Sequence, residues 1–348
     1  LLTGSSVDLD PLAAALMSNG FHGGFDVRSG QGDLILTRSL VAASVAVTAD
    51  GGLVSVSGLI DASGEKGGRI DLYGRDGVTL ASGARLAATG SDLDKRGGDI
   101  FIGTVGTGVI TLASNSSIDV SGGTLAGLSG GTLNLRAPIV NGDVNVSIGS
   151  SIGGARSVVL EAYKVFDTVG SNFDGVIDPS GRYDSAGNLL SSGVNQAHLD
   201  FYNTELVSFV QNPGVSFTRF ASVPNFHGRA GIELRNSDTT LNNGDIRVVS
   251  DWDFGAGTYN SATGARSLTW RAGIEPGVLT LRAAGSIDVR AVITDGFFNT
   301  TSTPVPHAAD LMPASWGDSW SYRIVGGADL ASVNPKALLP LSSFAGNS

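Results

Sequence analysis

The chain has no cysteine among its 348 residues, and only 16% of its residues are charged. The absence of cysteine excludes disulfide bonds and thiolate metal sites. Lysine and arginine number 22 against 32 aspartates and glutamates, so the net charge is −10. Binding to nucleic acid needs clusters of basic residues, and the sequence contains no such cluster. We therefore expect no nucleic-acid partner.

Long hydrophobic runs are also missing. A membrane-spanning helix needs roughly 20 consecutive apolar residues. The most apolar stretch, residues 40–60, is interrupted by serine, threonine, aspartate and glycine. The mean hydropathy is still slightly positive, at +0.15, which argues against a disordered polar chain. The sequence predicts a folded protein without a membrane span, long enough for one elongated domain or two compact ones.

What the sequence has instead is repetition. The stretches "LIDASG" (59–64), "RLAATG" (85–90) and "SIDVSG" (117–122) share an apolar pair at i and i+2, followed by a small residue and glycine. The phrase "GVITLASNSSIDV" (108–120) returns as "GVLTLRAAGSIDV" (277–289), with 8 of 13 positions identical. Such alternation predicts short, half-buried strands, and internal repeats indicate a stacked architecture.

The predicted strands come about every eight to ten residues, in groups of about 30, and glycine pairs such as Gly97-Gly98 often precede them. A helical solenoid would show a period near 3.6, and a Rossmann-like fold would need long helices between strands. The spacing fits an all-β parallel β-helix, with three short strands per turn and glycine at the corners. The inward-facing ladders that we expect are Ile70/Ile100, Leu72/Ile102, Val78/Ile110, Leu80/Leu112, Leu86/Ile118 and Ala88/Val120.

Two segments read as helical. "DLDPLAAALMSNG" predicts a short helix capped by Asp8 or Asp10, with Pro11 near its first turn and Gly20 at its end. The turn-rich stretch after Asp167 breaks the strand pattern, and "AHLDFYNTELVSFVQN" within it has helix-like apolar spacing. The expected organisation is a helix or loop over 1–20, β-helix turns over 21–166, an aromatic-containing insertion with one helix over 167–228, resumed turns over 229–298, and a Pro-rich loop with a partial turn over 299–348.

The insertion also contains a stretch with the spacing of a calcium loop. In "SNFDGVIDPSG" the order of Asn172, Asp174 and Asp178 follows the N-x-D-G-x-I-D pattern, and Asp184 follows in the same polar loop. The first and twelfth positions are glycines, so the two strongest oxygen donors are missing. An ordinary Asx-turn loop is the favoured interpretation. Asn172, Asp174, Asp178 and Asp184 remain as calcium candidates, and we expect no other cofactor.

Catalytic signals are sparse. Ser129 stands in a G-x-S-x-G match, but a strand follows it where a nucleophile elbow would need a helix. Paired carboxylates that cleave sugars must lie about 5–10 Å apart in a groove. Asp61 and Asp119 occupy equivalent repeat positions, and Asp288 matches them in the later copy. Recurrence at a repeat position is typical of a solvated outer face, so we expect no catalytic residue. The four histidines are dispersed, at positions 22, 198, 227 and 307.

Several of these motifs together resemble the filamentous-haemagglutinin-type exoproteins, which are long bacterial surface proteins exported by two-partner secretion. The resemblance rests on "FDVRSGQGDLIL", "GGRIDLYGRDGVTLASGARL", "SDWDF", "EPGVLTLRAAGSIDVRAVITDGF" and "SWSYRIVGGADL". It is weakest in the insertion. It implies a right-handed parallel β-helix, an internal piece of a longer shaft, an extracellular or cell-surface location, and an outer-membrane transporter as the partner during export.

The resemblance implies a structural or adhesive role in cell contact, fibre or biofilm assembly, with a surface glycan, a surface protein or further copies of the chain as partner. The alternative function is a polysaccharide-acting β-helix enzyme, either a lyase or a hydrolase. A cleft with three or more convergent carboxylates would favour the enzyme, whereas a featureless shaft with an exposed aromatic patch would favour adhesion or assembly. The tail "ASVNPKALLPLSSFAGNS" offers neither a strong capping helix nor a polar closing strand. We therefore expect that residues 1–348 either self-associate through the C-terminal end or occur only inside a longer chain or fibre.

Overall fold

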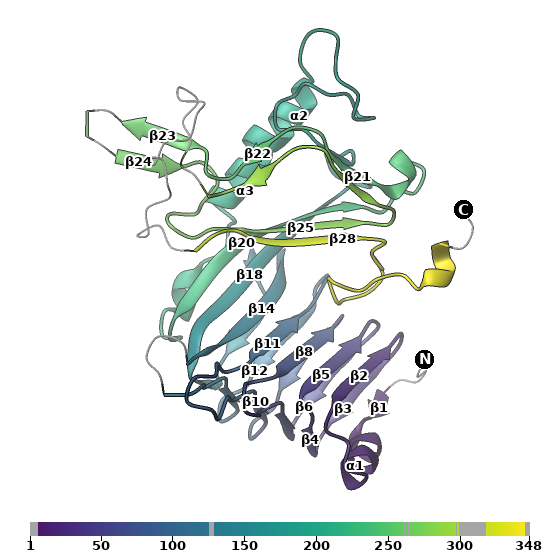
Figure 1. Cartoon of the computed structure of the whole chain (residues 1–348), viewed down its shortest axis with the longest axis vertical. Coiled ribbons are helices and arrows are strands. Elements are labelled where there is room, and N and C mark those ends of the chain that lie inside the picture. The colour runs from purple at the N-terminus through teal and green to yellow at the C-terminus, as the bar shows by residue number, and fades with distance from the viewer. Residues whose placement is uncertain are drawn as a thin grey trace. The chain divides into compact units, whose positions relative to one another are not determined.

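The protein is an all-β chain of mostly parallel strands that form two compact units (Figure 1). The computed structural model describes residues 6–124, 129–260, 262–263, 265–296, 298 and 318–344. Most of the expected Pro-rich loop, residues 301–317, therefore lies outside the described residues. The first unit comprises Leu1–Ala162, Val215–Gly228 and Ala331–Asn334, and the second comprises Tyr163–Gly214, Arg229–Leu330 and Pro335–Ser348.

The first unit consists of strands from three sheets, which the chain visits in the same order again and again. One strand from each sheet, taken in chain order, is called a layer below. The first sheet is β1 (Ser6–Asp8), β3 (Asp33–Leu36), β6 (Leu53–Val56), β9 (Gly77–Leu80), β12 (Val109–Leu112) and β16 (Val146–Ile148). The second is β4 (Ser39–Val41), β7 (Leu59–Asp61), β10 (Arg85–Ala87), β13 (Ser117–Asp119) and β17 (Ser151–Gly153). The third runs in this unit through β2 (Gly24–Ser29), β5 (Ser44–Ala49), β8 (Arg69–Gly74), β11 (Asp99–Gly103), β14 (Gly131–Val140) and the start of β18 (Ala155–Asp167); the short β15 (Asp143–Val144) pairs antiparallel with β14.

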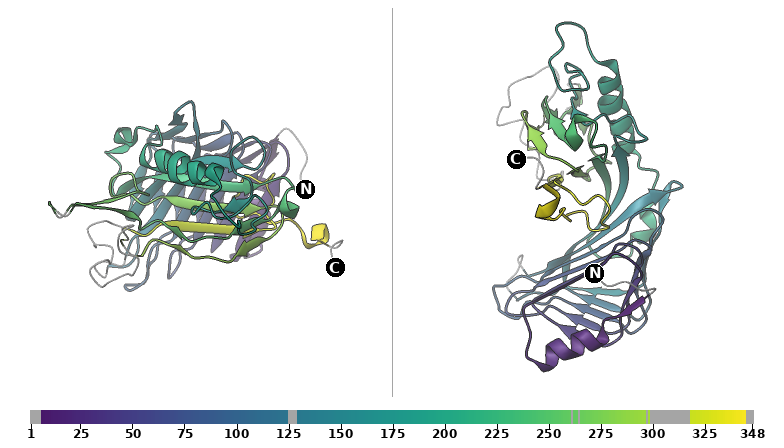
Figure 2. Two further views of the ribbon diagram at one scale, coloured as in Figure 1. Left: turned by 90° about the horizontal axis from the view of Figure 1, so that it is seen from above. Right: turned by 90° about the vertical axis from the view of Figure 1, so that its right-hand side faces the viewer.

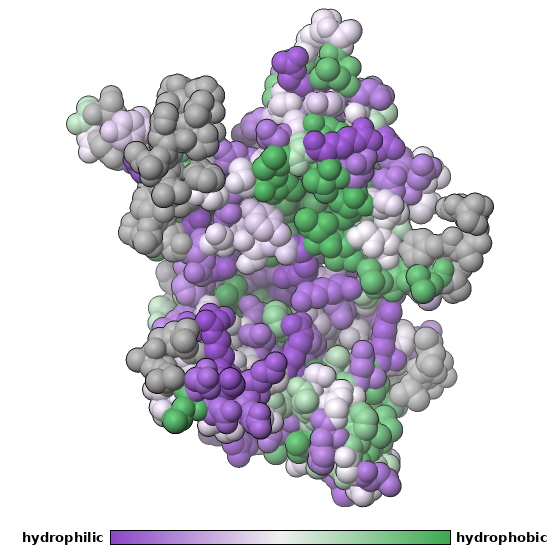
Figure 3. All heavy atoms as spheres, in the orientation of Figure 1, coloured by the Kyte–Doolittle hydropathy of each residue, from purple (hydrophilic) through white to green (hydrophobic). Residues whose placement is uncertain are grey.

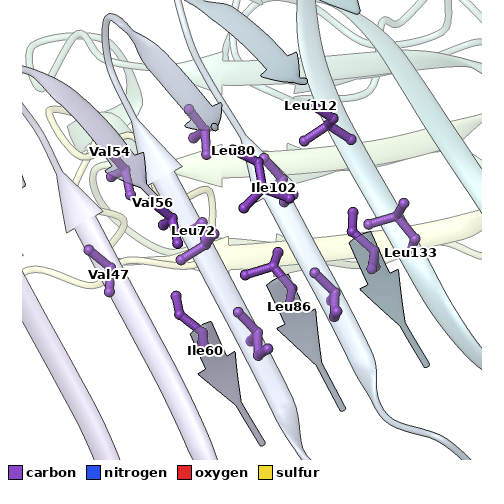
Figure 4. Packing of buried hydrophobic residues seen from close by; sticks show 14 of the residues in the cluster. Val47, Val54, Val56, Ile60, Leu72, Leu80, Leu86, Ile102, Leu112 and Leu133 are labelled. Carbon is purple, nitrogen blue, oxygen red and sulfur yellow. The ribbon is translucent and has the colours of Figure 1, made fainter. Parts of the chain in front are cut away.

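The apolar ladders predicted from the repeats are confirmed. Ile100 pairs with Ile70, Ile110 with Val78, and Ile118 with Leu86, each in parallel register. The same pairings align Ile102 with Leu72 and Leu112 with Leu80. Ala88 and Val120 follow directly after paired strands and are both buried. Figure 4 shows such side chains from neighbouring layers gathered in one core. Because each layer buries its apolar face on the next, stability comes from repetition.

The glycine pairs before the strands have a steric cause. A Cβ atom on Gly97 would collide with the carbonyl oxygen of Val120, and one on Gly131 would collide with that of Gly98. Neither glycine has a positive φ. These corners therefore need glycine because backbones of adjacent layers approach closely, rather than because the chain turns into a left-handed conformation.

Helix α1 (Asp10–Ser18) packs beside the first layer of the first unit (Figure 2). Leu9 and Ala13 belong to the apolar core of that unit. Asp8 accepts a hydrogen bond from the backbone N–H of Asp10 at 2.9 Å, but the N-cap residue is Leu9. The carboxylate of Asp10 instead accepts from the backbone N–H groups of Thr37 and Arg38, at 2.8 and 3.0 Å. The expected helix is present, but neither Asp8 nor Asp10 caps it, and Asp10 instead binds the turn between β3 and β4.

Residues 215–228 pack on the last layer of the first unit. Phe220, in the short 3-10 helix η2 (Phe217–Phe220), is buried in the core that Ile148 and Ile152 of the last strands also contact. The side chain of Asn225 donates a hydrogen bond to the carbonyl of Ala155 at 2.8 Å. The segment therefore covers apolar side chains that would otherwise face solvent.

The second unit repeats the layered plan with fewer strands. Its core is rich in aromatic rings, and Trp252 contacts Tyr202, Phe254 and Trp270. In this unit one sheet contains β18, β20 (Phe226–Asn236), β25 (Val278–Ala283) and β28 (Ser321–Gly326). A second sheet contains β19 (Val176–Ile177), β21 (Ile246–Val248) and β26 (Ile287–Val289), and in a third β22 (Trp252–Asp253) pairs with β27 (Ile293–Thr294). The strands β23 (Gly257–Asn260) and β24 (Ala265–Leu268) form an antiparallel pair, and η3 (Asn242–Gly244) and η6 (Leu341–Phe344) are short 3-10 helices.

The predicted insertion over 167–228 is not a separate element, which corrects our expectation that it lies outside the stacked strands. Residues 163–214 belong to the second unit and 215–228 to the first. β19 pairs in parallel with β21, so part of the segment is itself a strand of the stack. The expected helix is continuous from α2 (Gln196–Asp200) through the π-helix η1 (Phe201–Leu206) to α3 (Val207–Gln211), and it buries Tyr202 and Leu206 in the core.

Candidate functional site

The second unit contains a buried histidine between two carboxylates. His198 Nε2 lies 2.8 Å from Asp174 Oδ2, and His198 Nδ1 lies 3.1 Å from Asp178 Oδ2. The side chain of His198 is 5% exposed and that of Asp178 is fully buried, whereas Asp174 is partly exposed. We call these three residues the Asp–His–Asp cluster.

Local sequence places each member of the cluster. Asp174 caps its own turn by accepting a hydrogen bond from the backbone N–H of Val176, and Gly175 at a φ of 85° lets the chain turn there. Asp178 follows β19 directly. His198 lies in the first turn of α2, where Asn195 caps the helix by accepting from the backbone N–H of His198 at 3.3 Å.

Ionised carboxylates only accept hydrogen bonds, so the imidazolium form of His198, which donates from both ring nitrogens, satisfies both contacts. Burial alone would lower the pKa of His198, but the hydrogen bonds and charges of Asp174 and Asp178 outweigh it and raise that pKa above its ordinary value. Burial likewise pushes the pKa of Asp178 upward, yet donors from Ser180, His198 and Ser250 leave it below its ordinary value.

The cluster is part of a larger network of polar contacts. Both ring nitrogens of His198 contact carboxylates of the same chain. Asp178 also accepts hydrogen bonds from Ser180 Oγ at 2.6 Å and Ser250 Oγ at 2.8 Å. These contacts join the loop after β19, the helix and the segment after β21, which are distant in sequence.

The four calcium candidates are not gathered into one site. Asp174 and Asp178 meet at His198, which supplies their positive partner from the chain itself. Asn172 Nδ2 donates to Glu205 Oε2 at 2.8 Å, and Asp184 accepts from backbone N–H groups of its own loop. Within the described part of the chain, no group of three or more acidic or histidine side chains is arranged to hold a metal ion.

A shallow hollow of about 610 Å³ lies along the exposed face of the π-helix. Its two carboxylates are those of Asp200 and Glu205, and Glu205 lies 3.9 Å from the ammonium of Lys164. The lining residues are Asn172, Ala197, Asp200, Phe201, Thr204, Glu205 and Ser208. The hollow shares Asn172 with the calcium candidates, and the sequence pattern did not indicate it.

The carboxylates at the repeat positions serve turns and ion pairs. Asp61 accepts a hydrogen bond from the backbone N–H of Ser63, and Asp119 accepts one from that of Ser121, as in Asx turns. Ala87 of β10 lies between these two aspartates in the register, so they are two layers apart and do not stack directly on each other. Asp288 pairs with Arg290 of its own strand end. The carbonyl of Ser129 accepts from the backbone N–H of Gly97 at a corner, which agrees with a structural role.

The last strands of two sheets of the second unit, β26 and β28, expose apolar side chains whose ladder partners are buried. Val289 is 53% exposed and Ile324 is 51% exposed, although Val248 and Leu281, their ladder partners one layer earlier, are fully buried. A hydrophobic area in Figure 3 lies over the part of the molecule where Figure 1 labels β21, β25 and β28. We call this surface the open end; it consists of Ile287, Val289, Val292, Ile293, Tyr322 and Ile324.

Comparisons with protein families, with curated proteins and with solved structures gave no match for this chain. In the described part of the structure, no helix is long and apolar enough to cross a membrane. The fold and the surfaces above are therefore the basis for a functional proposal.

Proposed function

We propose that this chain is a structural and adhesive module of a large secreted bacterial surface protein of the filamentous-haemagglutinin type. In this proposal its layers are successive turns of a right-handed parallel β-helix. The observation that carries the proposal is the strict order in which the chain visits the sheets, with aligned apolar ladders between successive layers. Such a stack makes a long, stiff surface from contacts between neighbours only.

The use of the polar residues supports a structural role. Asp61, Asp119 and Asp288 serve turns or ion pairs, and the buried Asp178 serves the Asp–His–Asp cluster. A polysaccharide-cleaving enzyme would need two carboxylates that face one groove with room for a sugar ring and water. The carboxylates of the exposed hollow, Asp200 and Glu205, have partners in Gln196, Asn172 and Lys164. This arrangement supports binding or scaffolding over catalysis.

The proposal places the protein outside the cell, exported through an outer-membrane transporter, with a surface glycan or surface protein as its adhesion partner. The test is accessibility on intact cells that produce the protein. Antibody should label the protein on unbroken cells, and added protease should degrade it there. Protection from both reagents until the cells are lysed would overturn the surface location.

A second measurement separates adhesion from catalysis. The purified chain is incubated with a panel of polysaccharides, and both retention on the immobilised glycan and release of reducing or unsaturated ends are measured. We expect no release of new ends. Turnover of any polysaccharide would contradict the structural proposal and favour the enzyme.

A further inference from the structure

The hollow beside the π-helix has two walls, and both belong to the second unit. The helix that runs from α2 through η1 to α3 forms one wall and contributes Thr204, Glu205 and Ser208. The loop before β19 forms the other wall and contributes Asn172. A volume of about 610 Å³ is in the range of small-molecule sites, and π-helical turns are frequent at functional sites. The hollow therefore has the size and the setting of a ligand site.

The Asp–His–Asp cluster holds the two walls of the hollow together. Asp174 lies two residues after Asn172 in the loop, and His198 lies two residues before Asp200 in the helix. The contact of 2.8 Å between Asp174 Oδ2 and His198 Nε2 therefore joins the loop to the helix close to the lining residues. A site whose walls are fixed before the ligand arrives loses less conformational freedom on binding. The cluster thus gives the hollow a preformed shape.

The polar groups that line the hollow are oriented as well. Asp200 Oδ1 accepts a hydrogen bond from Gln196 Nε2 at 2.8 Å, and Glu205 Oε2 accepts one from Asn172 Nδ2 at 2.8 Å. Each carboxylate has about four lone-pair sites, so both keep capacity to accept further hydrogen bonds from a ligand. The hydroxyl groups of the helical wall can donate as well as accept. The lining therefore offers both kinds of hydrogen-bonding group in fixed positions.

This lining discriminates between classes of ligand. An anion would be repelled by the carboxylates of Asp200 and Glu205, and a cation would compete with the ammonium of Lys164, which lies 3.9 Å from Glu205. An extended peptide needs an unpaired strand edge or an apolar pocket. The helical wall pairs its backbone groups within the helix, and its aromatic residue, Phe201, is only 3% exposed. A ligand with many uncharged hydroxyl groups fits best, because each hydroxyl both donates and accepts.

We propose that the hollow binds an uncharged sugar of a surface glycan. This inference rests on the proposed function, because it assigns to the adhesive module the site that contacts its glycan partner. Sugar hydroxyls donate to the carboxylates of Asp200 and Glu205 and accept from the hydroxyls of Thr204 and Ser208. Each of these hydrogen bonds replaces one to water, so the affinity of a single site for a single sugar is low. Many sites that bind many sugars at once give the strength that adhesion needs.

The ligand class is tested by retention of the purified full chain on densely coated surfaces. The uncharged probes are oligosaccharides that end in glucose, galactose, mannose or N-acetylglucosamine. The charged probes are sialylated oligosaccharides, sulfated oligosaccharides and oligolysine. The chain should be retained on at least one uncharged sugar more strongly than on any charged probe. Lack of retention on every uncharged sugar, or equal or stronger retention on a charged probe, would overturn the proposal.

The position of the site is tested by filling the hollow. Ala197 is exposed and lines it, so Ala197→Trp should weaken retention on the sugar at least about tenfold. Leu189→Trp is the matched control, because Leu189 is 62% exposed in the same unit but lies outside the hollow, and it should leave retention unchanged. Circular dichroism should show that both variants are folded. Undiminished retention of a folded Ala197→Trp variant would overturn the site.

A smaller substitution gives a test that does not depend on a bulky side chain. Thr204→Val keeps the shape of an exposed residue and removes one hydroxyl, so retention should fall about two- to tenfold. If Ala197→Trp misfolds, unchanged retention of Thr204→Val would overturn the site. Both tests use the purified chain, so their results do not depend on where the cell places the protein. Failure to bind sugar would leave the cell-surface test unaffected, and failure of that test would leave the sugar measurement intact.

Discussion

Replacing His198 with glutamine removes the positive charge of the Asp–His–Asp cluster and keeps a side chain that can donate hydrogen bonds. The fully buried Asp178 then has no cationic partner. Breaking a buried ion pair by removing one partner costs about 3–5 kcal/mol. Asp178 keeps donors from Ser180, Ser250 and the backbone of Tyr183, and Asp174 is partly exposed to water. These contacts reduce the loss, so we expect His198→Gln to destabilise the second unit by about 2–3 kcal/mol.

The loss should depend on pH in a defined window. The pKa of His198 is raised in the folded protein, so its contribution is complete below the unfolded value of 6.5 and disappears as the pH rises through the folded value. The pKa of Asp178 is lowered, so its contribution is present above 3.8 and disappears as the pH falls through the folded value. The difference between the unmodified chain and His198→Gln should be largest between about pH 4 and 6.5 and should shrink in alkaline solution.

Tryptophan fluorescence reports on the second unit alone, because all four tryptophans of the sequence lie between residues 252 and 320. Trp252 packs against Tyr202, whose ring in turn packs on His198. Urea unfolding followed by this signal at pH 5.5 and pH 9 therefore measures the effect where it arises. The double variant His198→Gln/Asp178→Asn removes the buried charge as well, so it should be more stable than His198→Gln. Equal stability losses at both pH values would refute the assignment of an imidazolium to His198.

Three further changes test the fold. Ile110→Asp places a charge in a fully buried ladder and should destabilise the chain by at least about 3 kcal/mol in urea unfolding followed by circular dichroism. The neighbouring outward-facing Thr111→Asp should cost much less. A stable Ile110→Asp variant would contradict the ladder register. Asp10→Ala should lower the free energy of unfolding by about 1–2 kcal/mol at pH 7, because it leaves the backbone N–H of Thr37 without its acceptor. This loss should fade as the pH drops through the lowered pKa of Asp10. A loss that persists at low pH would argue against this contact. Deleting 170–226 should abolish cooperative thermal unfolding, since both cores lose residues, and a cooperatively folded deletion variant would show that the segment is dispensable.

The sequence alone determined the layered part of the fold, and the reason is that its information is local and periodic. The alternation around Ile100 and Ile110, together with the spacing between repeats, predicted which residues align across layers. The helix after Asp8 was visible because a proline and an apolar stripe precede a terminal glycine.

Only the tertiary structure decided what polar residues do and where irregular segments pack. Asp174, Asp178 and His198 are up to 24 residues apart in the sequence, and no spacing rule links them; they meet because β19 and α2 are held beside the same aromatic core. The segment 167–228 has no strand periodicity because a helix and a two-residue strand replace regular layers there. Its residues 167–214 belong to the second unit and 215–228 to the first. A periodic pattern records contacts between neighbouring layers, whereas contacts between segments without a common period arise only when the chain has folded.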